Sequence, residues 1–428
     1  MIKKILLSVI CLGTALTSIA QNYSIFGNHN KPSPVYRPNE EMTFTVKLLD
    51  NSEPVEGKKL KWIRTGDDGV VKEGEGISTK DGYVITTSAN ESGFVRIYVT
   101  AWDENGAQMM SSKPDKSGKR IPVFFDGGAC VEPNTLQSVA EPEDFDRYWA
   151  KQKGLLTAVP LEILKMSEVQ GDDEVAAYDV KIACPGKAPV SGYLTIPRNA
   201  AKKSLPATVA FRGYGVTGAD KDLTAGTSNI YFQINAHGIE NGKPGEYYDA
   251  LRATVLKDYA FSKEENQDPD TTYFHDMFLR IMRALEFVKS LPEWNGKQLT
   301  ASGGSQGGMQ SLAAAGLDKD VTDCYAWAPW CCDLGRTESG RIVGNWHIDY
   351  TPALRYYDPV NHVRRANPNC NLFIIANLGD YICPPSGVWI AYNNFPGPKK
   401  MEIRQGCEHG YMMKDYPAFT IEDNNRSE

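Results

Sequence analysis

The chain has 428 residues, of which 41% are hydrophobic and 23% charged, a composition typical of a globular protein long enough for two domains. Its formal net charge of -7 provides no basic field for a nucleic acid, and no long run of lysine or arginine occurs. We therefore expect no nucleic-acid partner.

The N-terminal residues 1–20 have the form of a secretory signal peptide. Lys3 and Lys4 precede an apolar run, and small residues lead up to Ala20. We predict cleavage after Ala20 and export to the periplasm or the extracellular space. Cys11 lies inside the apolar run, upstream of the better cleavage site, so lipidation is the weaker interpretation. No later stretch is long and apolar enough to cross a membrane.

Nine cysteines occur, and eight remain once Cys11 is removed with the signal. Export permits disulfides, but the spacings are wide and irregular, and a domain of this size does not need them, so we favour buried free thiols. Cys331 and Cys332 are adjacent and the six histidines are scattered, which leaves no zinc-binding pattern. We expect no metal site.

Residues 22–128 form short strand-like runs separated by turn signals. Met42, Phe44, Val46 and Leu48 alternate with polar residues, and residues 94–99 alternate likewise. This pattern predicts a small β-sandwich of immunoglobulin-like type, in which no residue looks catalytic.

In residues 129–428 the pattern changes, and strand-like runs alternate with helical stretches. A first helix begins near Pro142, and residues 274–291 carry a helical apolar stripe. The strand-like runs are residues 207–212, 230–235, 298–302, 324–328 and 371–377. Such alternation predicts an α/β fold with a mostly parallel sheet covered by helices on both faces.

The most informative motif is Gly303-Gly304-Ser305-Gln306-Gly307, which matches G-x-S-x-G. It follows the strand at 298–302 and precedes a helix at 309–317, as expected of the nucleophile elbow of an α/β-hydrolase. The glycines allow a strained turn with a serine at its apex. We predict that Ser305 is the nucleophile.

A serine nucleophile needs a base and an orienting carboxylate, which in this fold follow in the order Ser, Asp, His. Asp380 follows the strand at 371–377, and His409 is the one histidine after it. We assign them as acid and base. The weaker alternatives for the acid are Asp333, Asp358 and Glu408.

Acyl transfer also needs donors for the oxyanion. We assign them to the backbone N–H of Gln306, directly after the nucleophile, and to that of Tyr214 in the glycine-flanked loop FRGYG. Trp330 is the preferred substrate contact. The other tryptophans that we considered for a sugar-stacking pocket are Trp327, Trp346 and Trp389, although most such residues belong to the core.

Several segments together resemble the acetyl xylan esterase and cephalosporin-C deacetylase family of α/β-hydrolases. They are GGSQGG, SLPEW, FRGYG, GDYICPPS and PEDFDRYW, within residues 142–416. The resemblance implies a cofactor-free serine esterase that removes acetyl groups from sugars and some small molecules. Its nucleophile, acid and base fall on Ser305, Asp380 and His409, and its oxyanion donors on Tyr214 and Gln306. The chain departs from the family at His237-Gly238-Ile239 and at Arg212.

We accordingly predict a secreted serine esterase that deacetylates carbohydrates of xylan type through an acyl-enzyme. The alternatives are an esterase or peptidase of the same fold acting on non-carbohydrate substrates, and an inert glycan-binding protein. The resemblance also implies homo-oligomers, which family members tend to form. The change of pattern near residue 130 predicts that the catalytic part keeps at least weak activity without the β-sandwich.

Overall fold

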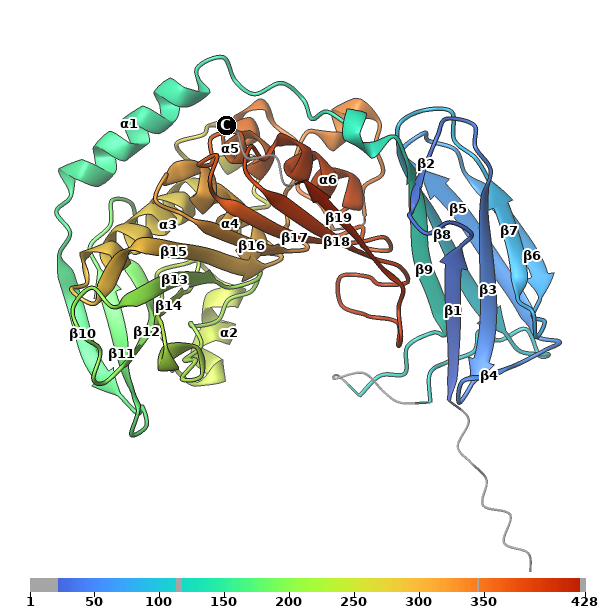
Figure 1. Cartoon of the computed structure of the whole chain (residues 1–428), viewed down its shortest axis with the longest axis horizontal. Helices are drawn as coiled ribbons and strands as arrows, with labels where there is room; N and C mark the ends of the chain where they lie inside the picture. Colours follow the sequence, from blue (N-terminus) through green and yellow to red (C-terminus); the bar gives the residue numbers. More distant parts are fainter. Residues whose placement is uncertain (1–21, 113–117, 345, 424–428) are drawn as a thin grey trace, which may run out of the picture.

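The computed structural model of the protein describes residues 22–112, 118–344 and 346–423 (Figure 1). The predicted signal peptide, residues 1–20, lies outside the described residues. The eight described cysteines are unpaired, and all except Cys184 are buried.

The N-terminal part consists of two sheets that enclose one core. One sheet contains β1, β3, β4 and β7, and the other has the order β2-β9-β8-β5-β6. Side chains that alternate along the strands, such as Phe44, Val46, Ile97 and Val99, fill the space between the sheets. A two-sheet β-structure is present, whereas its immunoglobulin-like type stays a prediction. The strands are β1 (Tyr23–His29), β2 (Val35–Tyr36), β3 (Met42–Asp50), β4 (Glu53–Pro54), β5 (Lys59–Gly66), β6 (Lys72–Ile77), β7 (Tyr83–Thr87), β8 (Gly93–Trp102) and β9 (Phe124–Val131).

The C-terminal part is built on one mixed sheet of ten strands in the order β10-β11-β12-β14-β13-β15-β16-β17-β18-β19. The strands from β14 to β18 are parallel to one another, and the outer strands pair antiparallel. The strands are β10 (Ile163–Val169), β11 (Val175–Ile182), β12 (Val190–Pro197), β13 (Leu205–Phe211), β14 (Ile230–Ile234), β15 (Trp294–Gly304), β16 (Asp323–Trp327), β17 (Asn371–Asn377), β18 (Lys399–Arg404) and β19 (Ala418–Asp423). The helices are α1 (Phe145–Ala158), α2 (Gly245–Ala253), α3 (Tyr273–Ser290), α4 (Gln306–Leu317), α5 (Pro359–Val363) and α6 (Pro385–Asn394).

The helices that follow the parallel strands, α3 to α6, lie on one face of this sheet, and only the short helix α2 is drawn below it (Figure 1), so the predicted cover on both faces is at most partial. Helices α3 to α6 lie on the same side (Figure 1), because the crossovers from β14 to β18 advance in one direction and right-handed crossovers then share a face. Between β13 and β14, where a crossover would cover the other face, the chain forms only the 3-10 turn Ala225–Thr227. Tyr325 and Trp327 are consequently 47% and 49% exposed.

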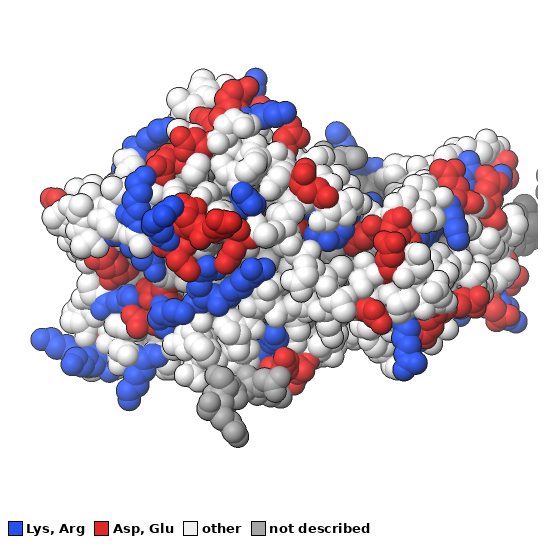
Figure 2. Space-filling model, turned by 90° about the horizontal axis from the view of Figure 1, so that it is seen from above, with Lys and Arg blue, Asp and Glu red and all other residues white. Residues whose placement is uncertain are grey.

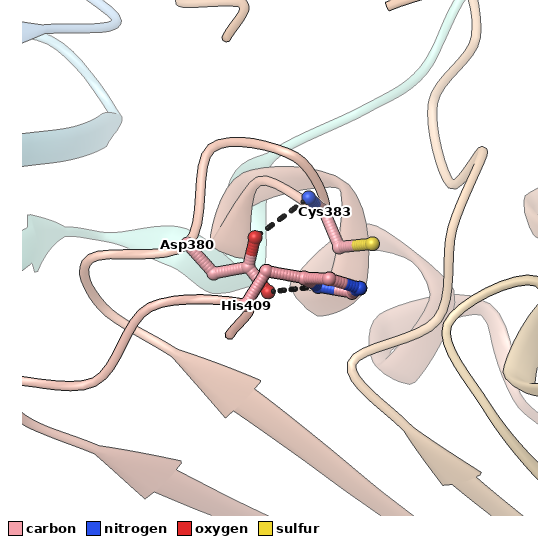
Figure 3. Close-up of side chains that lie close together, drawn as sticks. All are labelled: Asp380, Cys383 and His409. Atoms are coloured by element: carbon pink, nitrogen blue, oxygen red, sulfur yellow. Dashed lines mark hydrogen bonds and ion pairs between the residues drawn. The ribbon is translucent and has the colours of Figure 1, made fainter. Parts of the chain in front are cut away.

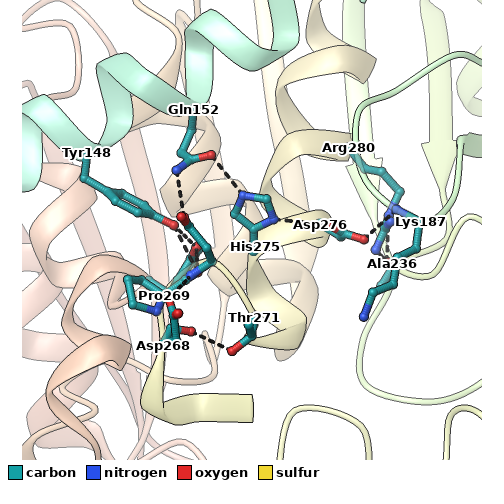
Figure 4. Close-up of polar contacts among 12 residues, drawn as sticks. Tyr148, Gln152, Lys187, Ala236, Asp268, Pro269, Thr271, His275, Asp276 and Arg280 are labelled. Carbon is teal, nitrogen blue, oxygen red and sulfur yellow. Dashed lines mark hydrogen bonds and ion pairs between the residues drawn. The ribbon is translucent and has the colours of Figure 1, made fainter.

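Helix α1 is held on the helical layer by polar contacts (Figure 4). The buried side chain of Gln152 donates to Asp270 (3.1 Å) and bonds to the ring of His275 (2.9 Å) at the start of α3. The hydroxyl of Tyr148 donates to the carbonyl of Pro269 (3.0 Å). These bonds satisfy polar groups that are buried between α1 and α3.

The surface seen from the helical side carries acidic and basic side chains close together (Figure 2). This face of the molecule therefore has no extended patch of a single charge sign. Among the described residues, none of the helices has the length and apolar character that crossing a bilayer requires.

Candidate active site

Ser305 lies at the sharp turn between β15 and α4. Its backbone has a φ of 57° and a ψ of -121°, a conformation that non-glycine residues rarely adopt. The flanking glycines are required by space, since a Cβ on Gly307 would lie 2.2 Å from the carbonyl oxygen of Phe211. A Cβ on Gly303 would lie 2.5 Å from the backbone of Gly307. The turn has the geometry that the motif predicted.

Three predicted residues from separate loops form one hydrogen-bonded chain. His409 Nε2 lies 2.9 Å from Ser305 Oγ, and His409 Nδ1 lies 2.8 Å from Asp380 Oδ2. The loops follow β15, β17 and β18, whose C-terminal ends lie along one edge of the sheet. Residues 104 positions apart in the sequence therefore meet at hydrogen-bond distance.

Asp380 and His409 are held in a geometry that suits a base. The carboxylate of Asp380 is buried, and its Oδ1 accepts the backbone N–H groups of Ile382 (3.1 Å) and Cys383 (2.8 Å). Burial alone would lower the pKa of His409, but the hydrogen bond and the negative charge of Asp380 outweigh it, so the pKa lies above 6.5. The carboxylate stabilises the imidazolium that forms when His409 takes a proton.

Cys383 also lies beside this pair (Figure 3), and the ligand-type atoms of Asp380, Cys383 and His409 lie within 4.8 Å of one another. Both ring nitrogens of His409 already bond to Asp380 and Ser305. Burial raises the pKa of the Cys383 thiol well above its usual value, which keeps the sulfur protonated. The cluster therefore serves the serine site rather than a metal.

Within the described part of the chain, none of the alternative acids has a side-chain hydrogen bond to His409. Asp358 caps α5 through the N–H of Val360 and accepts from Leu334, and Asp333 pairs with Arg341. Glu408 forms a hydrogen bond with Asp126 of the N-terminal part. The structure places Asp380 alone, of the four candidates, against the base.

The predicted oxyanion donors come from the start of α4 and from the loop after β13. Gln306 begins α4, where the first amides have no helical partner, and Tyr214 lies in the loop after β13. Neither backbone N–H donates to an acceptor among the described residues. Both donors are thus free to bind an oxyanion.

Tyr259 connects these two segments, a role that the sequence gave no signal for. Its hydroxyl accepts the N–H of Gly215 (2.8 Å) and donates to the side chain of Gln306 (2.8 Å). Its ring stacks on that of Tyr214 at 4.2 Å. Buried His237, at the departure from the family pattern, holds the carbonyl of Gly215 through its Nε2 (3.1 Å). Together they fix the loop that presents Tyr214.

Comparison with known proteins adds to this geometry. A family model described as acetyl xylan esterase (AXE1) matches residues 135–341 and 348–420, which is more than half of the chain. The chain belongs to the acetyl xylan esterase family. The match begins after β9, so the N-terminal sandwich lies outside it.

Individual relatives agree with the family match. The chain is 28% identical over 282 residues to the acetyl esterase Axe7A of Xylanibacter ruminicola, and the match spans 63% of each protein. An acetyl xylan esterase from Paenibacillus sp. R4 is 25% identical, with a TM-score of 0.54 over 65% of this chain and 92% of that one. Acetyl xylan esterase 1 from Thermoanaerobacterium sp. JW/SL YS485 is 22% identical and shares the fold, with a TM-score of 0.51 over 66% and 94%.

Trp330 is 2% exposed in this member of the acetyl xylan esterase family, and its contact with substrate stays a prediction. Trp330 stacks beneath Trp346 at a centroid distance of 5.0 Å and an interplanar angle of 20°. Trp346 is the partly exposed ring of the pair and lines a cleft beside His409. Trp327 is half exposed on the bare face of the sheet, and Trp389 is buried in α6.

The N-terminal sandwich contacts the loops that carry the acid and the base. A Cβ on Gly379, next to Asp380, would lie 2.3 Å from the carbonyl oxygen of Asp126 in β9. Met413, in the loop after His409, is buried in the core of the sandwich. The side chain of buried Gln405, at the start of this loop, bonds to both the N–H (2.9 Å) and the C=O (2.8 Å) of Gly128. These contacts argue against the predicted independence of the catalytic part.

Proposed function

We propose that this protein is a secreted serine esterase that removes acetyl groups from acetylated carbohydrates of xylan type. The observation that carries the proposal is the chain of hydrogen bonds from Ser305 through His409 to Asp380, at a strained elbow, in a member of the acetyl xylan esterase family. Export rests on the signal-like residues 1–20.

The geometry supports each step of the acyl transfer that we propose. His409 Nε2 takes the proton of Ser305 as the hydroxyl attacks the acetyl carbonyl, and Asp380 stabilises the imidazolium. The N–H groups of Tyr214 and Gln306 bind the oxyanion of the tetrahedral intermediate. His409 then gives its proton to the departing sugar oxygen, and water hydrolyses the acetyl-enzyme by the same route. The reaction needs no cofactor.

The test is acetate release from acetylated xylan and acetylated xylo-oligosaccharides, with 4-nitrophenyl acetate as a substrate without sugar. The proposal expects turnover of both kinds, lost in Ser305→Ala. Turnover of 4-nitrophenyl acetate alone would favour an esterase for non-carbohydrate substrates. No turnover of any short-chain ester would favour an inert glycan-binding protein.

A further inference from the structure

A cleft of about 340 Å³ opens beside the base, where the two parts of the protein meet. Arg96 of β8 contributes to it from the N-terminal sandwich, and Trp346, Tyr381, Glu408 and His409 contribute from the catalytic part. Its volume is in the range of small-molecule sites. Ser305 and the two oxyanion donors are not among its lining residues.

This lining indicates which half of an ester the cleft would hold. During acyl transfer the acetyl group stays on Ser305, between the oxyanion donors. The leaving alcohol must lie near His409, because Nε2 gives it a proton as the carbon–oxygen bond breaks. A cleft lined by His409 but not by Ser305 is therefore placed for the alcohol half.

We propose that this cleft binds the sugar from which the acetyl group is removed, and that Arg96 of the N-terminal sandwich is a specificity-determining residue for that sugar. The inference rests on the function proposed above and names the subsite for its leaving group.

Arg96 is held firmly and keeps one nitrogen available. Its Nε donates to Oδ1 of fully buried Asp126 at 2.8 Å, and its Nη2 donates to Oδ2 of the same carboxylate. The guanidinium lies 4.6 Å from the centroid of the Tyr381 ring. Nη1 has no hydrogen-bond partner within the described ranges, and the side chain is 27% exposed. A fixed, planar donor of this kind suits the oxygen atoms of a sugar.

Trp346 supplies an aromatic wall to the same cleft. Stacked Trp330 supports its ring from behind, and the rings of Tyr214 (4.8 Å) and Phe261 (5.1 Å) lie beside it. The apolar face of a sugar ring can pack on such a wall while its hydroxyls meet polar groups. Arg96 and Trp346 therefore provide both kinds of contact.

The charges in the cleft favour a neutral sugar over an anionic one. Asp126 already neutralises Arg96. Burial and the neighbouring Asp126 raise the pKa of Glu408 to about 8, so its carboxyl group is mostly protonated at pH 7. No uncompensated positive charge remains to attract a carboxylate.

The experiment compares kcat/KM for an acetylated xylo-oligosaccharide with kcat/KM for 4-nitrophenyl acetate. In Arg96→Lys, the ammonium retains the charge beside Asp126 but lacks the second planar nitrogen. We expect the ratio of the two values to fall about tenfold or more, mainly through KM for the oligosaccharide. The control is Arg198→Lys, an exposed arginine paired with Glu168, which should leave the ratio unchanged.

Trp346→Leu tests the aromatic wall of the cleft. It replaces Arg96→Lys as the test if circular dichroism shows that Arg96→Lys does not fold. We expect the ratio to fall in this variant too. A ratio within twofold of wild type, or an equal loss on both substrates, would overturn the sugar subsite while leaving the proposed function intact. A wild-type protein that hydrolyses 4-nitrophenyl acetate but no acetylated carbohydrate would instead overturn the proposed substrate, and the sugar subsite with it.

Discussion

Gln405→Leu should weaken both the protein and its catalysis, because Gln405 joins the base loop to the N-terminal sandwich. The side chain is fully buried and bonds to both backbone groups of Gly128. Leucine has a similar size but leaves a buried N–H and a buried C=O without partners, each at a cost of about 1–3 kcal/mol. We expect destabilisation by about 2–6 kcal/mol, which lowers Tm by several degrees. Because His409 follows four residues later, we also expect kcat to fall by about tenfold or more.

The assays are thermal unfolding followed by circular dichroism and kcat on 4-nitrophenyl acetate, a substrate whose leaving group carries no sugar. The control is Gln298→Leu, at an exposed glutamine of β15, which should change neither quantity appreciably. A Gln405→Leu variant with the Tm and kcat of wild type would refute the idea that the sandwich positions the base. A lower Tm with unchanged kcat would reduce the contact to a structural one.

Four further expectations concern the catalytic residues and the domain contact. Ser305→Ala and His409→Ala should each lower kcat for 4-nitrophenyl acetate by up to about a million-fold. The double variant should lose no more activity than either single variant, since the two residues act as one unit. Additive losses would contradict this. Because Asp380 holds the pKa of His409 above 6.5, kcat/KM measured from pH 5 to 9 should rise through a midpoint above 6.5 and then level off. A midpoint at or below 6.5 would count against the pairing of His409 with Asp380. Deleting residues 1–131 should give a fragment with at least about 100-fold lower kcat, since the loop of His409 loses its support. A soluble fragment with wild-type kcat would instead show that the catalytic part works without the sandwich. Because the pKa of Glu408 is raised, the folded state keeps a proton that the unfolded chain releases above about pH 4.5, and the stability of wild type should fall as the pH rises towards 8. Glu408→Gln cannot lose this proton. The Tm of the variant relative to that of wild type should therefore increase from pH 5 to pH 8.

The arrangement of the candidate site could be predicted because its signals are local. Two glycines on each side of a serine-glutamine pair, between a strand and a helix, permit the positive φ that Ser305 adopts. The acid and the base followed from chain order, and no other histidine competes after Asp380. Among the described residues, His409 Nε2 and Nδ1 have the two hydrogen bonds that this assignment requires.

The sequence was least informative where a residue's surroundings come from distant parts of the chain. Trp330 and Trp346 look alike as tryptophans near the site, and only packing decides that one is buried beneath the other. The cover on both faces was expected from alternating strands and helices, which do not reveal the direction in which crossovers advance. Tyr259 gave no signal, because its hydroxyl joins Gly215 and Gln306 across 44 and 47 residues of sequence.

The sequence by itself identified the family, the candidate nucleophile with its candidate acid and base, and the change from an all-β pattern to an α/β pattern. These features depend on backbone constraints and periodicities that act within a few residues, or on the fixed order of a triad. Only the tertiary structure decided that the sandwich packs against the triad loops, through Gln405, Met413 and the carbonyl of Asp126 beside Gly379. It also decided that Arg96 lies in the cleft beside His409. The physical reason is that burial, close approach of backbones and pairing of charges are set by contacts between residues hundreds of positions apart, which no local pattern specifies.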